Sequence, residues 1–163
     1  MSTKKKMKEK IKMPNLRWAI LCKTASVDQQ TNNLSIFNVI EEFTVNKSIS
    51  TSPVTGRLSN FSDKTQINGD FTVVIQLDNC TDIKTAKFDL EINFSSPDGI
   101  SFAKTELSPV FQEGKNRLRI IVALNAIIIK DPGVYNFIIS TRTDEDDSFM
   151  ERTRIPLEVK IFD

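Results

Sequence analysis

Short segments in which apolar and polar residues alternate dominate the sequence. Residues 71–77 and 86–94 show the pattern most clearly, with an apolar side chain at every second position. A period of two is the signature of a β-strand that buries one face. Comparable segments recur along the chain and predict eight strands, near residues 16–23, 34–43, 71–77, 86–94, 100–107, 117–124, 135–139 and 155–161.

Turn residues separate these segments, and no long helical pattern is present. The stretch 28–33 is polar, and residues 96–99 read Ser-Pro-Asp-Gly, with Pro early and Gly late as β-turns favour. Short strands at this spacing are typical of an antiparallel sandwich or barrel. The sequence therefore predicts an all-β protein with a basic, disordered tail over residues 1–13 and a single β-sandwich domain over residues 14–163.

Three segments depart from simple alternation. Residues 16–23 and 34–43 are apolar on both faces near their middles, which predicts strands that are central or covered on both sides. Pro156 lies on the outward face of the last strand and predicts that this strand is an edge, because Pro cannot donate to a ladder. Eight of the 24 residues in 45–68 are Ser or Thr, so we expect a loop there that is either functional or mobile.

One motif narrows the fold. The spacing of Val122, Leu124, Ile127, Asp131, Gly133 and Tyr135 resembles the corner between strands E and F of immunoglobulin-like domains. This resemblance implies an antiparallel immunoglobulin-like β-sandwich of about eight strands, in which Gly133 permits a tight turn and the Tyr135 hydroxyl bonds back to the corner near Asp131. Antibody domains also have an inter-sheet disulfide and a Trp in the third strand, and neither is evident here.

A second resemblance concerns the beginning of the chain. Residues 19–22 and 34–39, taken with the later Gly-x-Tyr-x-Phe of residues 133–137, are similar to an uncharacterised bacterial family of such sandwiches. The resemblance implies a bacterial protein and implies no activity, because that family has none assigned.

The composition of the chain excludes most kinds of catalytic site. The chain has no His, so His-based catalytic dyads and triads and His-ligated metals are excluded. Two Cys cannot form a four-thiolate zinc site, and the chain has neither a GxxxxGK[ST] nor a GxGxxG phosphate loop. Cys22 alternates with core positions and is expected to be a buried thiol, whereas Cys80 near a turn is expected to be exposed. We therefore expect no enzyme and no cofactor.

The net charge of +1 hides an asymmetry. Residues 1–12 hold six Lys and one Glu, a charge of +5, which leaves −4 on the remaining residues. This tail, including Lys4, Lys5 and Lys6, either only aids solubility or contacts nucleic acid or an anionic surface. Its apolar runs are too short for a secretion signal, and no segment is long enough to span a membrane. These features predict a cytoplasmic protein with reduced thiols.

Acidic turns raise the question of a metal site. If connections alternate between the two ends of a sandwich, the turns near Asp28, near Asp78 and Asp82, and at residues 144–147 share one end. Clustered carboxylates suit calcium, as in the lipid-binding C2 domain, and the candidate ligands are Asp78, Asp82, Asp144, Asp146 and Asp147. Polar hairpin tips are the plainer interpretation, because no segment reproduces a known calcium-ligand spacing.

The favoured interpretation is a non-enzymatic protein-interaction or adaptor module whose partner and oligomeric state the sequence leaves open. Its candidate surfaces are the 45–68 loop, the corner with Ile127, Ile128 and Ile129 if these are exposed, and an open sheet edge that accepts a partner strand. The alternative is a C2-like sandwich that engages calcium and an anionic surface. Carbohydrate binding is disfavoured because Trp18 and Tyr135 occupy positions expected to be buried.

Overall fold

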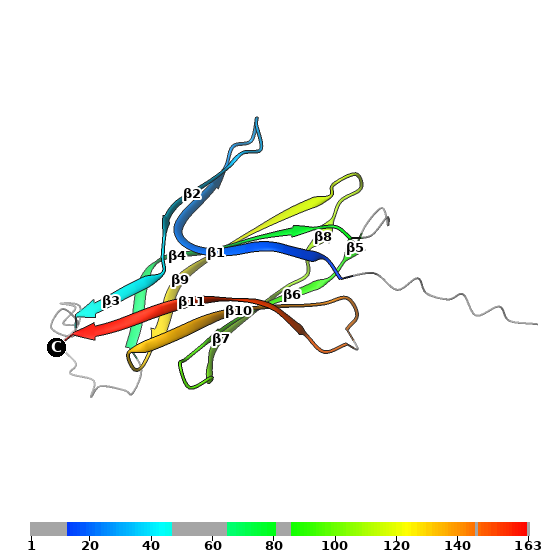
Figure 1. The fold of residues 1–163 in the computed structure, drawn as a ribbon. Coiled ribbons are helices and arrows are strands. Elements are labelled where there is room, and N and C mark those ends of the chain that lie inside the picture. The colour runs from blue at the N-terminus through cyan, green and yellow to red at the C-terminus, as the bar shows by residue number, and fades with distance from the viewer. Residues whose placement is uncertain (1–12, 47–64, 81–85, 146, 163) are drawn as a thin grey trace, which may run out of the picture.

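A computed structural model describes residues 13–46, 65–80, 86–145 and 147–162. These residues form eleven strands and no helix, so the all-β prediction is confirmed (Figure 1). In particular, they contain no helix long and apolar enough to cross a membrane. The strands are β1 (Asn15–Val27), β2 (Leu34–Val39), β3 (Glu42–Asn46), β4 (Thr65–Asp78), β5 (Ala86–Lys87), β6 (Asp89–Ser95), β7 (Ser101–Leu107), β8 (Val110–Phe111), β9 (Arg117–Ile129), β10 (Gly133–Arg142) and β11 (Met150–Phe162).

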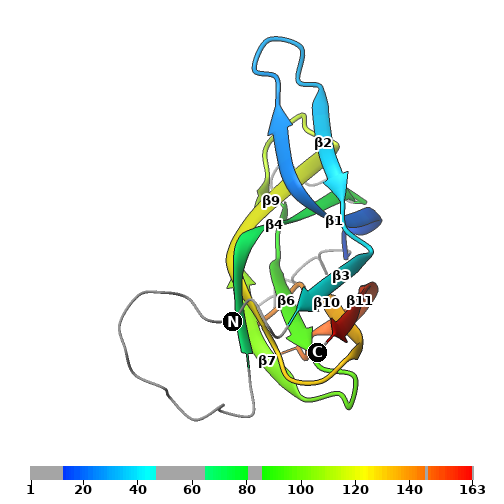
Figure 2. The same cartoon turned by 90° about the vertical axis from the view of Figure 1, so that its left-hand side faces the viewer.

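Two sheets pack face to face (Figure 2). One has four strands in the order β2-β1-β4-β9, and the other has five in the order β3-β11-β10-β6-β7, while β5 and β8 form a small separate pair. All pairings are antiparallel except that of β3 with β11. The result is a β-sandwich whose arrangement is compatible with an immunoglobulin-like fold.

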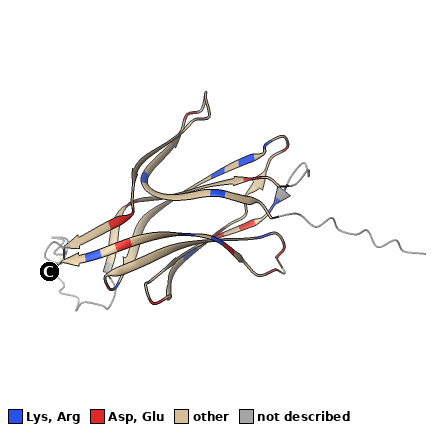
Figure 3. Ribbon diagram, viewed as in Figure 1, with Lys and Arg blue, Asp and Glu red and all other residues tan. Residues whose placement is uncertain are grey.

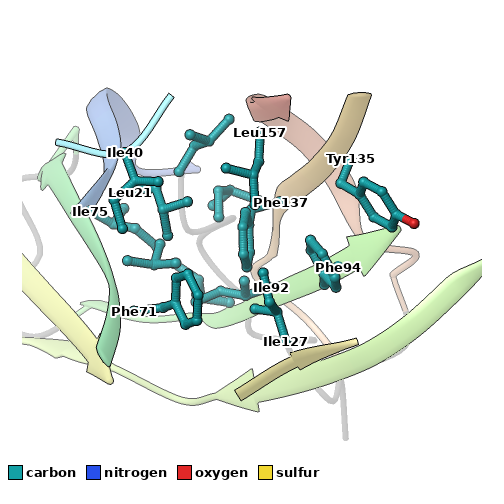
Figure 4. Packing of buried hydrophobic residues seen from close by; sticks show 14 of the residues in the cluster. Leu21, Ile40, Phe71, Ile75, Ile92, Phe94, Ile127, Tyr135, Phe137 and Leu157 are labelled. Carbon is teal, nitrogen blue, oxygen red and sulfur yellow. The ribbon is translucent and has the colours of Figure 1, made fainter. Parts of the chain in front are cut away.

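The core lies between the two sheets and is built from the inward positions of each strand (Figure 4). Phe94 stands at its centre, with ring centroids 4.6 Å from Phe137 and 5.4 Å from Tyr135. All three rings are almost fully buried. Each such side chain contributes roughly 1.5–3 kcal/mol by leaving water, so this aromatic cluster is a main source of cohesion between the sheets.

Residues 71–77 of β4 are buried on both faces of the strand, which the alternating sequence does not predict. Val73 and Ile75 face the core as expected, but Val74 on the opposite face is also fully buried. The register explains this, because Val74 pairs with Ile20 of β1 on one side and with Ile121 of β9 on the other. Apolar neighbours from two flanking strands thus cover the outer face of a central strand.

Two predictions about strands need correction. The single strand expected over residues 34–43 is divided at Ile40, so that β2 stays in the four-stranded sheet while β3 crosses to the other. Strand β11 is not an edge, because it pairs with both β10 and β3. Pro156 is nevertheless accommodated, because β3 pairs with β11 only from Glu158 onward. No hydrogen bond to β3 therefore needs a backbone N–H at position 156.

The corner before β10 has the geometry that the motif predicts. The Tyr135 hydroxyl donates to the carbonyl oxygen of Asp131 at 2.9 Å and accepts from the backbone N–H of Lys130 at 2.8 Å and of Asp131 at 3.2 Å. Gly133 has φ +142°, and a Cβ there would lie 2.8 Å from Cγ of Pro97. The corner is therefore fixed by one buried hydroxyl and by one residue that lacks a side chain.

Candidate functional site

The three isoleucines at the end of β9 do not form a surface patch. Ile127 and Ile129 are only 3% and 1% exposed and belong to the core, while Ile128 is half-buried. Of the two arrangements that the sequence allowed, burial is the one observed. Ile127 and Ile128 instead line a cleft beside β9.

This cleft opens between the two sheets and has a volume of about 210 Å³. Leu124 and Ile127 of β9 form one wall, and Ala103 of β7 lies on the other. Phe94 and Phe137 also line it, and Figure 4 shows Ile92 between Phe137 and Ile127. The volume exceeds the roughly 150 Å³ of an engineered apolar cavity that accepts benzene. The cleft therefore has room for one or two apolar side chains.

The strands at the mouth of the cleft are both sheet edges. Within the described part of the chain, β9 pairs only with β4, and β7 pairs only with β6. The seven residues of β7 include Lys104 and Glu106, charges that discourage unwanted strand pairing. Strand β9 differs, because the ten residues from Ile120 to Ile129 include no charged side chain. A long, uncharged edge is an aggregation hazard unless something covers it.

Several side chains of β9 are placed where a covering strand would reach them. The inward-facing Leu118, Ile120, Val122 and Leu124 pack against the core but stay partly exposed. On the outer face, Ile121 is 39% exposed and Ala123 is exposed. Both faces of this edge thus keep apolar surface that a neighbouring strand would remove from water.

A row of alternating charges crosses the four-stranded sheet near the beginning of β9. Asp78 lies in the middle, and its carboxylate accepts a hydrogen bond from Nε of Arg17 on β1. On the other side, Nε of Arg117 on β9 is 3.9 Å from the same carboxylate. The arginine side chains are each 56% exposed, against 19% for Asp78. The hydrogen bond and the charge of Asp78 raise the pKa of Arg17.

Arg17, Asp78 and Arg117 line a depression in the surface, which Asn79, Cys80 and two more cations also border. Arg119 is held in place, since it donates from Nη1 to the carbonyl oxygen of Asn32 at 2.6 Å and from Nε to Gln76 Oε1 at 3.4 Å. Lys115 lies in the turn before β9. Lys115, Arg117 and Arg119 alternate along the sequence, whereas Arg17 joins them only through the long-range pairing of β1 with β4.

Arg152 and Arg154 of β11 are both bound to other groups of the protein. Arg154 makes a two-pronged contact with Glu151, from Nε at 2.6 Å and from Nη2 at 2.9 Å. Arg152 donates from Nη2 to the carbonyl oxygen of Pro14 at 3.2 Å. These side chains therefore fasten β11 locally and tie it to the beginning of β1.

The described acidic residues do not converge on one site (Figure 3). The carboxylate of Asp28 accepts three hydrogen bonds from its own turn, from the backbone N–H groups of Gln30 and Thr31 and from the Thr31 hydroxyl, and these lower its pKa. Asp78 is bound to arginine. The turn of Asp28 lies well away from the β10–β11 turn, which corrects the expectation of one shared end (Figure 1).

The calcium prediction therefore has little geometric support. Asp144 and Asp147 lie in the β10–β11 turn, whereas Asp82 and Asp146 are outside the described residues. No three acidic or thiol side chains of the described residues form a group that could hold a metal ion. Lys4, Lys5 and Lys6 of the basic tail are likewise outside the described residues, and the proposal that they contact an anionic partner stays a prediction.

Four remaining predictions concern single side chains. Cys22 is fully buried, and burial raises the pKa of its thiol, while Cys80 is exposed, as expected for both. Tyr135 is buried as predicted. Trp18 is only half-buried, because it lies on the outer face of the four-stranded sheet opposite Gln76.

Neither protein-family models nor curated proteins give a match to this chain, so its site is interpreted from its own geometry.

Proposed function

We propose that the protein is a non-enzymatic interaction module that binds an extended segment of another protein along β9. The observation that carries this proposal is the uncharged edge from Ile120 to Ile129, which borders an apolar cleft and has no second strand among the described residues. Strand addition to an open edge supplies backbone hydrogen bonds, and pockets beside the edge supply sequence preference.

The cleft would provide that preference. A strand added to β9 has side chains on alternate faces, and those on the inner face point toward the space between Leu124 and Ala103. One large apolar side chain entering the cleft would gain roughly 1.5–3 kcal/mol from burial. The backbone ladder gives affinity for extended segments in general, and the cleft selects those with an apolar residue at the matching position.

The proposal also covers the fold family and the cellular location of the protein. We propose an immunoglobulin-like sandwich of the uncharacterised bacterial type, which the hydroxyl of Tyr135 at the β9–β10 corner supports. A cytoplasmic location is proposed as well, because Cys22 and Cys80 are both free thiols, as is usual for proteins in a reducing compartment.

The proposal is tested with a display library of random twelve-residue peptides selected on the full-length protein. Selection on the wild type should enrich extended, apolar peptides. The Ala103→Trp variant fills the cleft from an exposed position on β7 and should lose this enrichment. Ser35→Trp introduces the same side chain at an exposed position of the distant edge β2 and is the matched control. Thermal unfolding of both variants checks that each is folded.

Two results would overturn the proposal. One is that the wild type enriches no family of peptides. The other is that the Ala103→Trp variant enriches the same peptides as the Ser35→Trp control, which would place binding elsewhere on the molecule.

A further inference from the structure

The geometry points to a partner segment that is acidic at one end, the end that lies beside Arg117 and Arg119. This inference rests on the proposed function, because it describes the chemistry of the segment that binds along β9. It follows from the charged side chains at the beginning of that strand, which are not part of the apolar cleft.

The first step is the charge row across the sheet. Arg17 of β1, Asp78 of β4 and Arg117 of β9 follow one another across three adjacent strands in the order cation, anion, cation. The row stops at Arg117 because β9 is the sheet edge. A strand added there places its own residue next to Arg117, and opposite charges at such cross-strand positions stabilise the pair. An Asp or Glu at this position continues the alternation.

The second step is the neighbouring row. Arg119 lies two residues after Arg117, on the same face of β9. It pairs with Gln76 of β4, which in turn pairs with Trp18 of β1. Its hydrogen bonds to Gln76 of β4 and to Asn32 of the β1–β2 turn fix the guanidinium on the β4 side of the edge strand. A second acidic residue, two positions from the first on the added strand, would therefore be the cross-strand neighbour of a residue whose positive charge is fixed in position.

The third step is the balance of charge in the depression. Its lining contains Arg17, Lys115, Arg117 and Arg119 against one carboxylate, that of Asp78, which leaves a net charge of +3. Asp28 lies beyond Arg117 and Lys115, in the β1–β2 turn, but its carboxylate is already bonded within that turn. Two acidic residues of the partner would offset most of this charge, and two basic residues would be repelled.

Strand direction fixes which end of the partner is acidic. Antiparallel pairing is slightly more stable per residue than parallel pairing, and it is the rule in the four-stranded sheet. The C-terminal end of an antiparallel partner lies beside the N-terminal end of β9. The partner segment is therefore apolar through its middle and carries its Asp or Glu residues toward its C-terminus.

A second copy of β9 does not fit this description. In an antiparallel β9–β9 pair, the residues near Arg117 of one copy would be Ile129, Lys130 and Asp131 of the other. Lys130 and Asp131 carry opposite charges, with Nζ and Oδ2 4.0 Å apart, and so add no net negative charge. The depression would remain cationic, which favours a different protein as the partner.

Two capped nonapeptides of identical composition test the inference. In one, Thr and Val alternate and Glu replaces the last two Thr; the other is the same sequence reversed. We expect the peptide with C-terminal Glu to bind the wild type about tenfold more tightly at low salt, the sum of two favourable cross-strand pairs. This preference should shrink at high ionic strength. It should also disappear in the double variant Arg117→Gln, Arg119→Gln and persist in Lys130→Gln, at the opposite end of β9.

The outcomes separate the two claims. Equal binding of both peptides, lost in the Ala103→Trp variant, would overturn the acidic end and leave the edge site standing. Tighter binding of the reversed peptide would overturn the inferred direction and with it this inference. Binding of neither peptide would count against the edge site itself. A wild-type dimer in sedimentation analysis that Ala103→Trp dissociates would show that a second copy occupies the edge.

Discussion

The hydroxyl of Tyr135 is bonded to both backbone groups of Asp131, accepting from its N–H at 3.2 Å and donating to its carbonyl oxygen at 2.9 Å. The hydroxyl oxygen of Tyr135 also accepts a hydrogen bond from the N–H of Lys130. One buried side chain thus satisfies three backbone groups where the chain turns from β9 into β10. Because β9 carries the proposed binding edge, this corner sets where that edge ends.

Replacing Tyr135 with Phe should lower the free energy of unfolding by roughly 1–3 kcal/mol, since the ring stays and the partners of the hydroxyl are left unsatisfied in a buried place. Urea denaturation of wild type and variant measures the change. An unchanged midpoint and slope would mean that the hydroxyl contributes nothing to the corner.

Gly133→Ala should be clearly destabilising for two reasons that a matched variant separates. Its φ of +142° is unfavourable for Ala, and the added Cβ would lie 2.8 Å from Cγ of Pro97. Gly99 also has a positive φ, +84°, but nothing lies within 4 Å of its Cβ position. Gly99→Ala should therefore cost about 1 kcal/mol and Gly133→Ala distinctly more. Equal losses in thermal unfolding would exclude a role for the contact with Pro97.

Acid should weaken the fold partly through Asp89. The hydroxyl of Ser108 at 2.7 Å and the guanidinium of Arg142 at 3.0 Å both donate to its carboxylate and lower its pKa. A lowered folded-state pKa contributes stability that is complete above the unfolded value of about 4 and is lost as pH falls through the folded value. The melting temperature of Asp89→Asn should therefore fall less steeply below about pH 4 than that of wild type. Parallel curves for the two proteins would contradict this role.

The two thiols should react at very different rates. Cys80 is exposed, whereas Cys22 is fully buried and burial raises the pKa of its thiol. A thiol-specific chromogenic reagent should modify one thiol quickly in the native protein and two in denaturant, because the thiolate is the reactive species. Cys80→Ser should abolish the fast phase. Rapid modification of both thiols in the native state would show that β1 opens readily around Cys22.

Much of the fold could be predicted because local alternation specifies a strand and its inward face. Phe71, Val73, Ile75 and Leu77 were identified in this way, and all are buried. Gly133 and Tyr135 were predicted from their spacing, since a corner of this kind is local in sequence. What escaped prediction depends on distant partners. Burial of Val74 requires Ile20 and Ile121 alongside it, a relationship that no short window of sequence contains.

In the candidate site, too, the features that depend on distant residues escaped prediction. An open sheet edge was expected, but its location at β9 was not, because the pairing of distant strands decides which strand is an edge. The sequence could not predict the cleft either, because the walls formed by Ala103 and Leu124 meet only after the two sheets pack. The position of Arg17 beside Asp78 was equally out of reach, since 61 residues separate the two.

Hydrogen–deuterium exchange tests the central claim, that β9 is the edge which receives a partner strand, most directly. The full-length protein is compared with and without a saturating amount of the nonapeptide with C-terminal Glu. An added strand pairs with the open side of β9, so exchange should slow across residues 117–129 and remain unchanged in β2, the opposite edge of the same sheet. Slowing confined to β2 or β3, or none at residues 117–129, would contradict the account.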